Sequence, residues 1–197
     1  MKLQDARKDH YRKLAHEQGF RSRAAYKLKE LNQSYRIIGP GFYVLDLGCA
    51  PGGWTQMAVK LAGNQGKVMG IDLSYVEEIP GAHILRGDIE DENVVDEVMD
   101  YFERKVNAVI CDLSPKVSGN WSVDHAKQIS LNYDCTKIMD KVLAHKGNAV
   151  FKVFDGEYSM EFKDYVKKKF ARINLTKPKA SRKQSSELYY VCLGFIG

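Results

Sequence analysis

The sequence lacks any long apolar segment. No run of about 18 consecutive apolar residues, the length that a membrane-spanning helix requires, occurs among its 197 residues. Its first residues are charged and include no apolar core of the kind found in secretory signals. Hydrophobic residues nevertheless make up 44% of the chain, which is enough to bury a full core. We therefore expect a globular, cytoplasmic protein with no membrane partner, folded as a single domain over residues 1–197.

Metal-binding and redox patterns are also absent. The four cysteines form no C-x-x-C pair, and the five histidines form no H-E-x-x-H motif and no cluster with cysteine. Structural zinc sites need such closely spaced ligands, so we expect no metal. Cysteines without a disulfide pattern indicate reduced thiols in a cytosolic protein.

Acidic residues are scarce in two segments. Residues 1–36 hold ten Lys or Arg and four acids, and residues 167–183 hold eight basic residues and no acid. The net charge of the whole chain is +5, so the remainder carries −9. Two basic segments on an acidic body favour a polyanionic partner over a merely solvated charged surface. The candidate nucleic-acid contacts are Arg21, Arg23, Lys179, Arg182 and Lys183.

Apolar strands and amphipathic helices alternate along most of the chain. Residues 1–20 are interpreted as a basic helix or a mobile arm, and Arg21–Leu31 as a helix that Ser22 caps. Strands are expected near 42–47, 67–71, 82–86, 106–111, 147–153, 171–176 and 187–195, and helices near 53–62, 92–104, 124–145 and 159–169. This alternation predicts an α/β fold with a mostly parallel, doubly wound sheet. The last two strands have too short a link for a helical crossover, so we expect them to pair antiparallel.

The stretch from Tyr43 to Trp54 predicts a strand, a glycine-rich turn and a helix start. Such a turn lets the backbone approach a ligand closely, because its glycines have no Cβ. A dinucleotide fold would carry G-x-G-x-x-G, but Ala50 stands at the second glycine and Pro51 follows it. Asp72 ends the next strand, where a carboxylate grips ribose hydroxyls. The pattern favours a nucleoside ligand without phosphates, and S-adenosylmethionine is the obvious candidate.

The segment Asp46-Leu-Gly-Cys-Ala-Pro-Gly-Gly-Trp54 resembles the first motif of the FtsJ/RrmJ family of S-adenosylmethionine-dependent RNA ribose 2′-O-methyltransferases. The resemblance covers about residues 10–195. It implies a Rossmann-like fold with a seven-stranded, mostly parallel sheet, an antiparallel last strand and helices on both faces. Residues 1–36 would be a basic N-terminal arm and 37–197 the catalytic core. The implied cofactor-binding residues are Asp46, Gly48, Ala50, Pro51, Gly52, Gly53, Trp54, Asp72, Leu73, Asp88, Ile89 and Asp112.

Four polar residues match the Lys-Asp-Lys-Glu tetrad of that family in order. They are Lys27, Asp112, Lys152 and Glu187. Lys152 lies inside an apolar run, where a lysine is rare unless it is paired, although its stem could instead reach the surface. Asp112 ends a buried strand, the usual place for a site in α/β sheets. The four residues that begin with Asp112 are Asp-Leu-Ser-Pro, whereas enzymes that methylate exocyclic amines carry an Asp-Pro-Pro or Asn-Pro-Pro pattern there. This difference argues against methylation of a base.

The tetrad suggests how a ribose hydroxyl is activated. A free lysine has a pKa of about 10.4, but burial and a second ammonium both favour the neutral amine. We hypothesise that neutral Lys152 accepts the 2′-hydroxyl proton, that Lys27 is the second charge, and that Asp112 and Glu187 orient the amines. The oxygen would then attack the methyl group of S-adenosylmethionine.

Several interpretations remain open from the sequence. A short chain with a basic arm resembles the family members that methylate a uridine in large-subunit ribosomal RNA, and we expect a monomer acting on that RNA, within the large ribosomal subunit. A tRNA anticodon-loop methyltransferase shares the tetrad and is the alternative. A non-catalytic RNA-binding assembly factor and an NAD-dependent oxidoreductase are less favoured, because the tetrad is intact and the turn carries Ala50 and Pro51.

Overall fold

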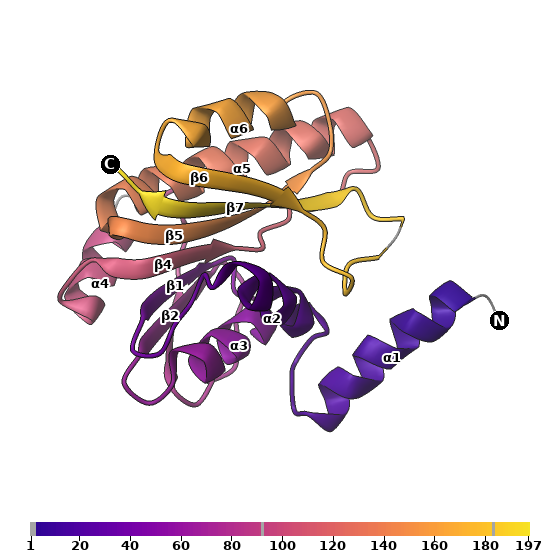
Figure 1. Ribbon diagram of the computed structural model, residues 1–197, viewed down its shortest axis with the longest axis horizontal. Helices are drawn as coiled ribbons and strands as arrows, with labels where there is room; N and C mark the ends of the chain where they lie inside the picture. Colours follow the sequence, from indigo (N-terminus) through magenta and orange to yellow (C-terminus); the bar gives the residue numbers. More distant parts are fainter. Residues whose placement is uncertain (1–2, 92, 183) are drawn as a thin grey trace.

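A seven-stranded sheet forms the centre of the molecule (Figure 1). The structure, a computed structural model, describes residues 3–91, 93–182 and 184–197, with side chains from residue 10 onward. The strands are β1 (Tyr43–Leu47), β2 (Lys67–Asp72), β3 (Ala82–Arg86), β4 (Val106–Cys111), β5 (Leu143–Phe154), β6 (Phe170–Thr176) and β7 (Glu187–Phe195). Their spatial order is β3-β2-β1-β4-β5-β7-β6.

The first five strands run parallel, and β7 runs antiparallel to both β5 and β6. This confirms the predicted mostly parallel sheet with a reversed last strand. The final strand lies between β5 and β6, so β6 forms the edge. The carboxyl ends of β1, β4 and β5 consequently lie at one edge of the sheet, together with the start of β7.

Helices cover both faces of the sheet (Figure 1). They are α1 (Leu3–Glu17), α2 (Ala24–Tyr35), α3 (Gly53–Ala62), α4 (Asn93–Phe102), α5 (Trp121–Val142) and α6 (Ser159–Lys167). Alternation along β1 divides the core in two, as the two-residue period of a strand requires: Val44 packs with α2 and α3, whereas Leu45 and Leu47 pack with α4, α5 and α6.

Helix α1 extends from the layer of α2 and α3 (Figure 1). It contacts α2 through Tyr11, whose ring lies 5.6 Å from that of Tyr26. The hydroxyl of Tyr11 also donates to Glu30 at 2.9 Å. The basic N-terminal segment is therefore helical over Leu3–Glu17 and packs against α2.

Two local predictions were wrong. Ser22 does not cap the helix that follows it: α2 begins at Ala24 after Arg23, which makes no side-chain cap. A Cβ on Gly53 would clash with Ser22 Oγ, so that hydroxyl lies against the start of α3 instead. The helix predicted at 124–145 spans Trp121–Val142, and β5 begins directly at Leu143, several residues before the predicted strand.

All four cysteines are free and buried. In the described part of the chain, no helix combines the length and apolar character that crossing a membrane would require.

Candidate active site

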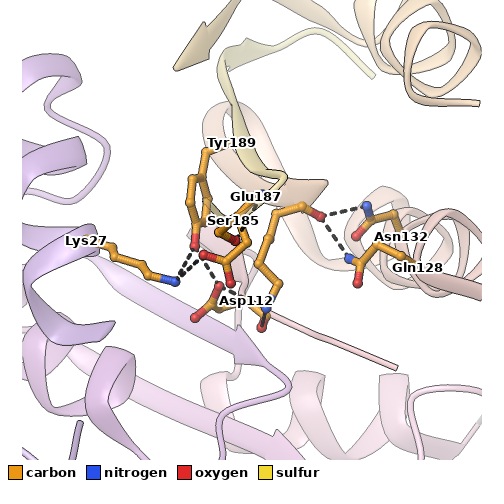
Figure 2. Close-up of polar contacts among 8 residues, drawn as sticks. Lys27, Asp112, Gln128, Asn132, Ser185, Glu187 and Tyr189 are labelled. Carbon is orange, nitrogen blue, oxygen red and sulfur yellow. Dashed lines mark hydrogen bonds and ion pairs between the residues drawn. The ribbon is translucent and has the colours of Figure 1, made fainter. Parts of the chain in front are cut away.

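Four chain segments bring the predicted tetrad together at the carboxyl edge of the sheet (Figure 2). Asp112 follows the end of β4, Lys152 lies near the end of β5, Glu187 opens β7, and Lys27 projects from α2. The parallel pairing of β4 and β5 brings the first two together, and the antiparallel return of β7 adds the third. Residues separated by 160 positions therefore share one polar cluster.

The tetrad is organised as two amine–carboxylate pairs. Lys27 Nζ donates to Glu187 Oε2 at 2.9 Å. Lys152 Nζ donates to the backbone carbonyl of Asp112 at 2.6 Å and lies 3.3 Å from its Oδ1. Lys27 and Lys152 are only 6% and 4% exposed, and buried lysines need such partners. The alternative that Lys152 extends to the surface is therefore wrong.

The Lys27 ammonium also controls the charge of Glu187. Burial alone would raise the pKa of this carboxyl, but the charge and hydrogen bond of the adjacent Lys27 lower it below its ordinary value. The Ser185 hydroxyl accepts a hydrogen bond from the Glu187 backbone N–H at 3.2 Å, which fixes the start of β7. Glu187 is therefore an ionised, oriented partner for Lys27 at neutral pH.

Tyr189 joins the two pairs, and sequence reasoning missed it. Its hydroxyl accepts from Lys27 Nζ at 3.1 Å and donates to Asp112 Oδ1 at 2.9 Å (Figure 2). Burial, followed by the nearby Asp112 and Glu187, raises its pKa well above the ordinary value, so the phenol keeps its proton. A signal was present: Tyr189 stands two residues after Glu187, so both side chains leave β7 on the same face.

Two buried amides hold the backbone of Lys152. Gln128 and Asn132, four residues apart on α5, each donate to the Lys152 carbonyl at 2.9 Å (Figure 2). The β4–β5 pairing ends at Phe151, so this carbonyl lies one residue beyond the ladder. The two amides supply the hydrogen bonds that β4 no longer provides at this residue, and they hold the backbone from which the Lys152 side chain extends. Their spacing along one helix face was the available sequence signal.

Side chains from other parts of the chain pack directly against the glycines of the turn between β1 and α3. Gly48 has a φ of +77°, and a Cβ there would clash with Leu113. Gly52 has a φ of +112°, and its Cβ would come within 2.6 Å of Ile79. The two positions thus need glycine for backbone conformation and for internal packing, whether or not a ligand approaches the turn.

Asp46 is a fully buried carboxylate at the end of β1. Its Oδ2 accepts from Thr55 Oγ1 at 2.6 Å. Its Oδ1 is buried and has no partner among the described residues. Burial, opposed in part by the Thr55 hydrogen bond, raises the pKa of Asp46 to about 7. Next to the turn, Asp46 Oδ1 is therefore a buried acceptor without a hydrogen-bond partner among the described residues, on a carboxyl that is only partly ionised near pH 7.

The other residues predicted to bind the cofactor surround this turn. Asp72 accepts from the backbone N–H groups of Ala50 and Ser74 at 2.9 and 2.8 Å, so it also anchors the turn. Leu73 is exposed beside it. The ring of Trp54, buried, stacks on that of Tyr189 at 5.8 Å.

The predicted adenine contact lies in a turn of its own. Asp88 Oδ1 accepts from the Glu90 backbone N–H at 3.0 Å. Ile89 between them is partly buried against the core.

The predicted RNA contacts fall into different settings. Arg21 donates its guanidinium N–H groups to the carbonyls of Glu77 and Glu78, each at 2.8 Å, next to the turn. Arg23, by contrast, feels the charges of Arg182 and Glu187. Burial and then the positive charge of Arg182 lower its pKa from the ordinary value, so Arg23 lies within electrostatic range of both Arg182 and Glu187.

The basic loop that follows β6 is tied to α2. The backbone N–H of Lys179 donates to Glu30 Oε2 at 2.6 Å. This contact uses the Lys179 backbone and not its ammonium. Lys183 lies outside the described residues. Across the described ranges, no three His, Cys, Asp or Glu side chains are placed to hold a metal ion.

Comparison with known proteins identifies the family of the chain. A family described as FtsJ-like methyltransferase matches residues 20–195. The chain is 97% identical, over the full length of both proteins, to a protein named ribosomal RNA large subunit methyltransferase E from Nitrosopumilus maritimus (strain SCM1). It is 65% identical, again over both full lengths, to a protein of the same name from Cenarchaeum symbiosum (strain A). A crystal structure from Plasmodium falciparum that carries the name of a ribosomal RNA methyltransferase matches with a TM-score of 0.82 and 30% identity, over 90% of this chain and 100% of that one.

Proposed function

This chain belongs to the FtsJ-like methyltransferase family, and from that premise we propose that it methylates a ribose 2′-oxygen in large-subunit ribosomal RNA with S-adenosylmethionine as methyl donor. The observation that carries the proposal is the buried pair of amine–carboxylate contacts, Lys27 with Glu187 and Lys152 with Asp112, linked by Tyr189. We further propose that residues 1–197 act as one monomeric methyltransferase domain in the cytoplasm, with residues 1–36 as its basic arm.

The residues around the β1–α3 turn fit the methyl donor. The buried Oδ1 of Asp46, which has no partner among the described residues, is a hydrogen-bond acceptor suited to the ammonium group of S-adenosylmethionine. Asp72, the last residue of β2, and Asp88, two residues after β3, offer further carboxylate oxygens to ribose hydroxyls and to an adenine amino group. When bound, S-adenosylmethionine supplies an electrophilic methyl group on a sulfonium that departs as an uncharged thioether.

The chain's own residues position and activate the ribose. In this proposal the neutral Lys152 amine accepts the 2′-hydroxyl proton at Nζ, and the Asp112 carbonyl and Oδ1 hold that nitrogen in place. Gln128 and Asn132 keep the Lys152 backbone from shifting. Such preorganisation supplies much of the rate of a reaction whose partners are held in line.

The substrate assignment rests on charge and on relatives. Arg23 lies within electrostatic range of both Arg182 and Glu187, and the two arginines can pair with RNA phosphates. Relatives at 97% and 65% identity carry the name of a large-subunit ribosomal RNA methyltransferase. These names favour ribosomal RNA over the anticodon loop of tRNA, and an intact tetrad favours an enzyme over a passive assembly factor.

The test is methyl transfer from labelled S-adenosylmethionine to unmodified large ribosomal subunits, free ribosomal RNA and tRNA, followed by alkaline hydrolysis. A 2′-O-methyl group blocks cleavage at its own 3′ phosphate, so label should appear in a dinucleotide from ribosomal RNA. Label in a mononucleotide would mean that a base is methylated. Label found only with tRNA would show that tRNA, and not ribosomal RNA, is the substrate.

A lysine variant tests the mechanism. Lys152→Ala should abolish turnover while donor binding, measured by calorimetry, stays nearly unchanged. The control is Lys169→Ala, which removes a lysine paired with Asp140 at 2.6 Å, just before β6 and at the opposite end of the strands from the tetrad. Wild-type turnover in Lys152→Ala would remove this residue from the mechanism.

A further inference from the structure

An aromatic stack lies beside the tetrad and has no part in the chemistry described above. The rings of Trp121 and His125 are nearly parallel, 13° apart, with centroids separated by 6.1 Å. His125 and Tyr158 are likewise nearly parallel, at 14° and 5.6 Å. The three rings, from α5 and the residue preceding α6, thus form one continuous pile.

The outer rings of the pile are open to solvent and the middle one is not. Trp121 and Tyr158 are 49% and 42% exposed, whereas His125 is 3% exposed. Exposed aromatic rings grouped around one buried ring differ from apolar residues scattered singly over a surface, and such groups mark places where something binds. The pile therefore presents unused aromatic surface at its ends.

The fold ties this pile to the catalytic strand. Trp121, His125, Gln128 and Asn132 follow one another at helical spacing along one face of α5, and the last two hold the carbonyl of Lys152. The Trp121 ring also lies 5.7 Å from that of Phe154, two residues beyond Lys152 on β5. Trp121 therefore lies at the carboxyl end of β5, the strand that carries Lys152.

The end of the loop between Asp112 and α5 is fixed as well. Asp124 accepts from the backbone N–H and the hydroxyl of Ser118, both at 2.7 Å, and from the Gly119 backbone N–H at 3.3 Å. This carboxylate holds the Ser118–Gly119 turn that leads into α5. The start of α5, which carries Trp121, is thereby fixed to the end of the loop that precedes it.

We propose that the exposed Trp121 ring, at one end of the pile, is a stacking platform for an unpaired nucleobase of the RNA, next to the nucleotide that is methylated. The proposal rests on the proposed function and adds a base-binding subsite to it. Sequence-specific RNA recognition uses unpaired bases splayed onto aromatic side chains, and each such stack contributes substantially to binding.

The surroundings favour a base over a phosphate. His125 Nε2 accepts from the Tyr158 backbone N–H at 3.0 Å, so this nitrogen carries no proton. Burial lowers the pKa of His125, with the nearby Glu157 and Asp155 opposing that shift. The middle ring is therefore neutral, and the two carboxylates disfavour a phosphate there. A flat, uncharged base suits the site.

Three variants test the platform: Trp121→Ala, Trp121→Phe and the control Val123→Ala. Val123 lies in the same first turn of α5, is 41% exposed and takes part in no ring contact given above. Trp121→Ala should raise KM for RNA about tenfold to a hundredfold, with kcat and donor affinity within about twofold of wild type. Trp121→Phe should restore most of the affinity, and Val123→Ala should match wild type.

Fluorescence provides a second readout that a folding defect would not imitate. The chain has two tryptophans, and Trp54 is buried. A single-stranded RNA oligonucleotide should quench the emission of wild-type protein, and an abasic oligomer of equal length and charge should not. Trp121→Phe should lose this quenching while it still binds RNA.

The outcomes separate this proposal from the function on which it rests. Wild-type protein that fails to methylate ribosomal RNA would overturn the proposed function. An active wild type, together with a Trp121→Ala variant whose KM is unchanged, would overturn the platform alone. Equal quenching by normal and abasic oligomers would also overturn it, and a KM increase seen only with assembled subunits would assign the rings to a protein contact instead.

Discussion

Replacing Asp46 by asparagine should make the protein increasingly stable, relative to wild type, as the pH rises. Asp46 is fully buried and its pKa lies at about 7, raised from 3.8. Between these two values the folded chain keeps a proton that the unfolded chain has already released. The contribution of Asp46 to wild-type stability therefore falls as the pH rises from about 4 to about 7. The Asp46→Asn variant has no such proton to lose, so its stability lacks this pH-dependent contribution.

The magnitude follows from the two pKa values. Their difference of about 3 pH units corresponds to about 4 kcal/mol at 1.36 kcal/mol per unit. The variant can keep the hydrogen bond from Thr55, but its amide donors face a position without a partner, which costs about 1–3 kcal/mol at every pH. The difference between variant and wild type should thus change by about 4 kcal/mol between pH 4 and pH 8.

Thermal unfolding at several pH values, followed by circular dichroism, measures this change. In a domain of this size 1 kcal/mol shifts Tm by roughly 2–4 °C, so the relative Tm of Asp46→Asn should rise by about 10 °C across the range. Asp100→Asn, at an exposed position of α4, is the control. The same Asp46→Asn variant should bind S-adenosylmethionine more weakly, because amide hydrogens would meet the donor's ammonium group. A Tm difference that stays constant from pH 4 to pH 8 would refute the reasoning about burial.

Two further predictions concern the tetrad and the RNA surface. Tyr189→Phe removes the hydroxyl that joins Lys27 to Asp112, so kcat should fall about tenfold to a hundredfold with donor binding retained. The control is Tyr190→Phe, which loses only a hydrogen bond to the Ser159 carbonyl; equal kcat values in steady-state assays would contradict the linking role. Arg182→Ala should lower RNA affinity and reduce the slope of log K against log salt by about 0.7. A salt series measured by fluorescence anisotropy checks this, and an unchanged slope would place the phosphate contacts elsewhere.

Local patterns predicted much of the fold and the tetrad. Apolar runs of strand length, broken by glycine and polar turns, are short-range signals, so the seven strands could be located from sequence. Lys152 was conspicuous because a lysine flanked by Phe151 and Val153 conflicts with its surroundings. The resemblance to a known family then supplied the order of the tetrad, which the structure groups in space.

What the sequence could not provide was the pairing of distant groups. Nothing local indicated that Lys27 meets Glu187, that Tyr189 spans both pairs, or that Arg21 binds carbonyls rather than facing outward. The contacts of Glu187 and Tyr189 depend on β7 inserting between β5 and β6, whereas the Arg21 contacts depend on how the segment before α2 packs against the loop that follows β2.

The sequence by itself therefore determined which residue types stand at the ends of which strands, because a strand's period and a turn's glycines are encoded within a few positions. Only the tertiary structure decided which carboxylate meets which amine, and which aromatic rings stack beside them. Those choices follow from sheet order and helix packing, where chain segments far apart in sequence share one buried space and must satisfy each other's polar groups.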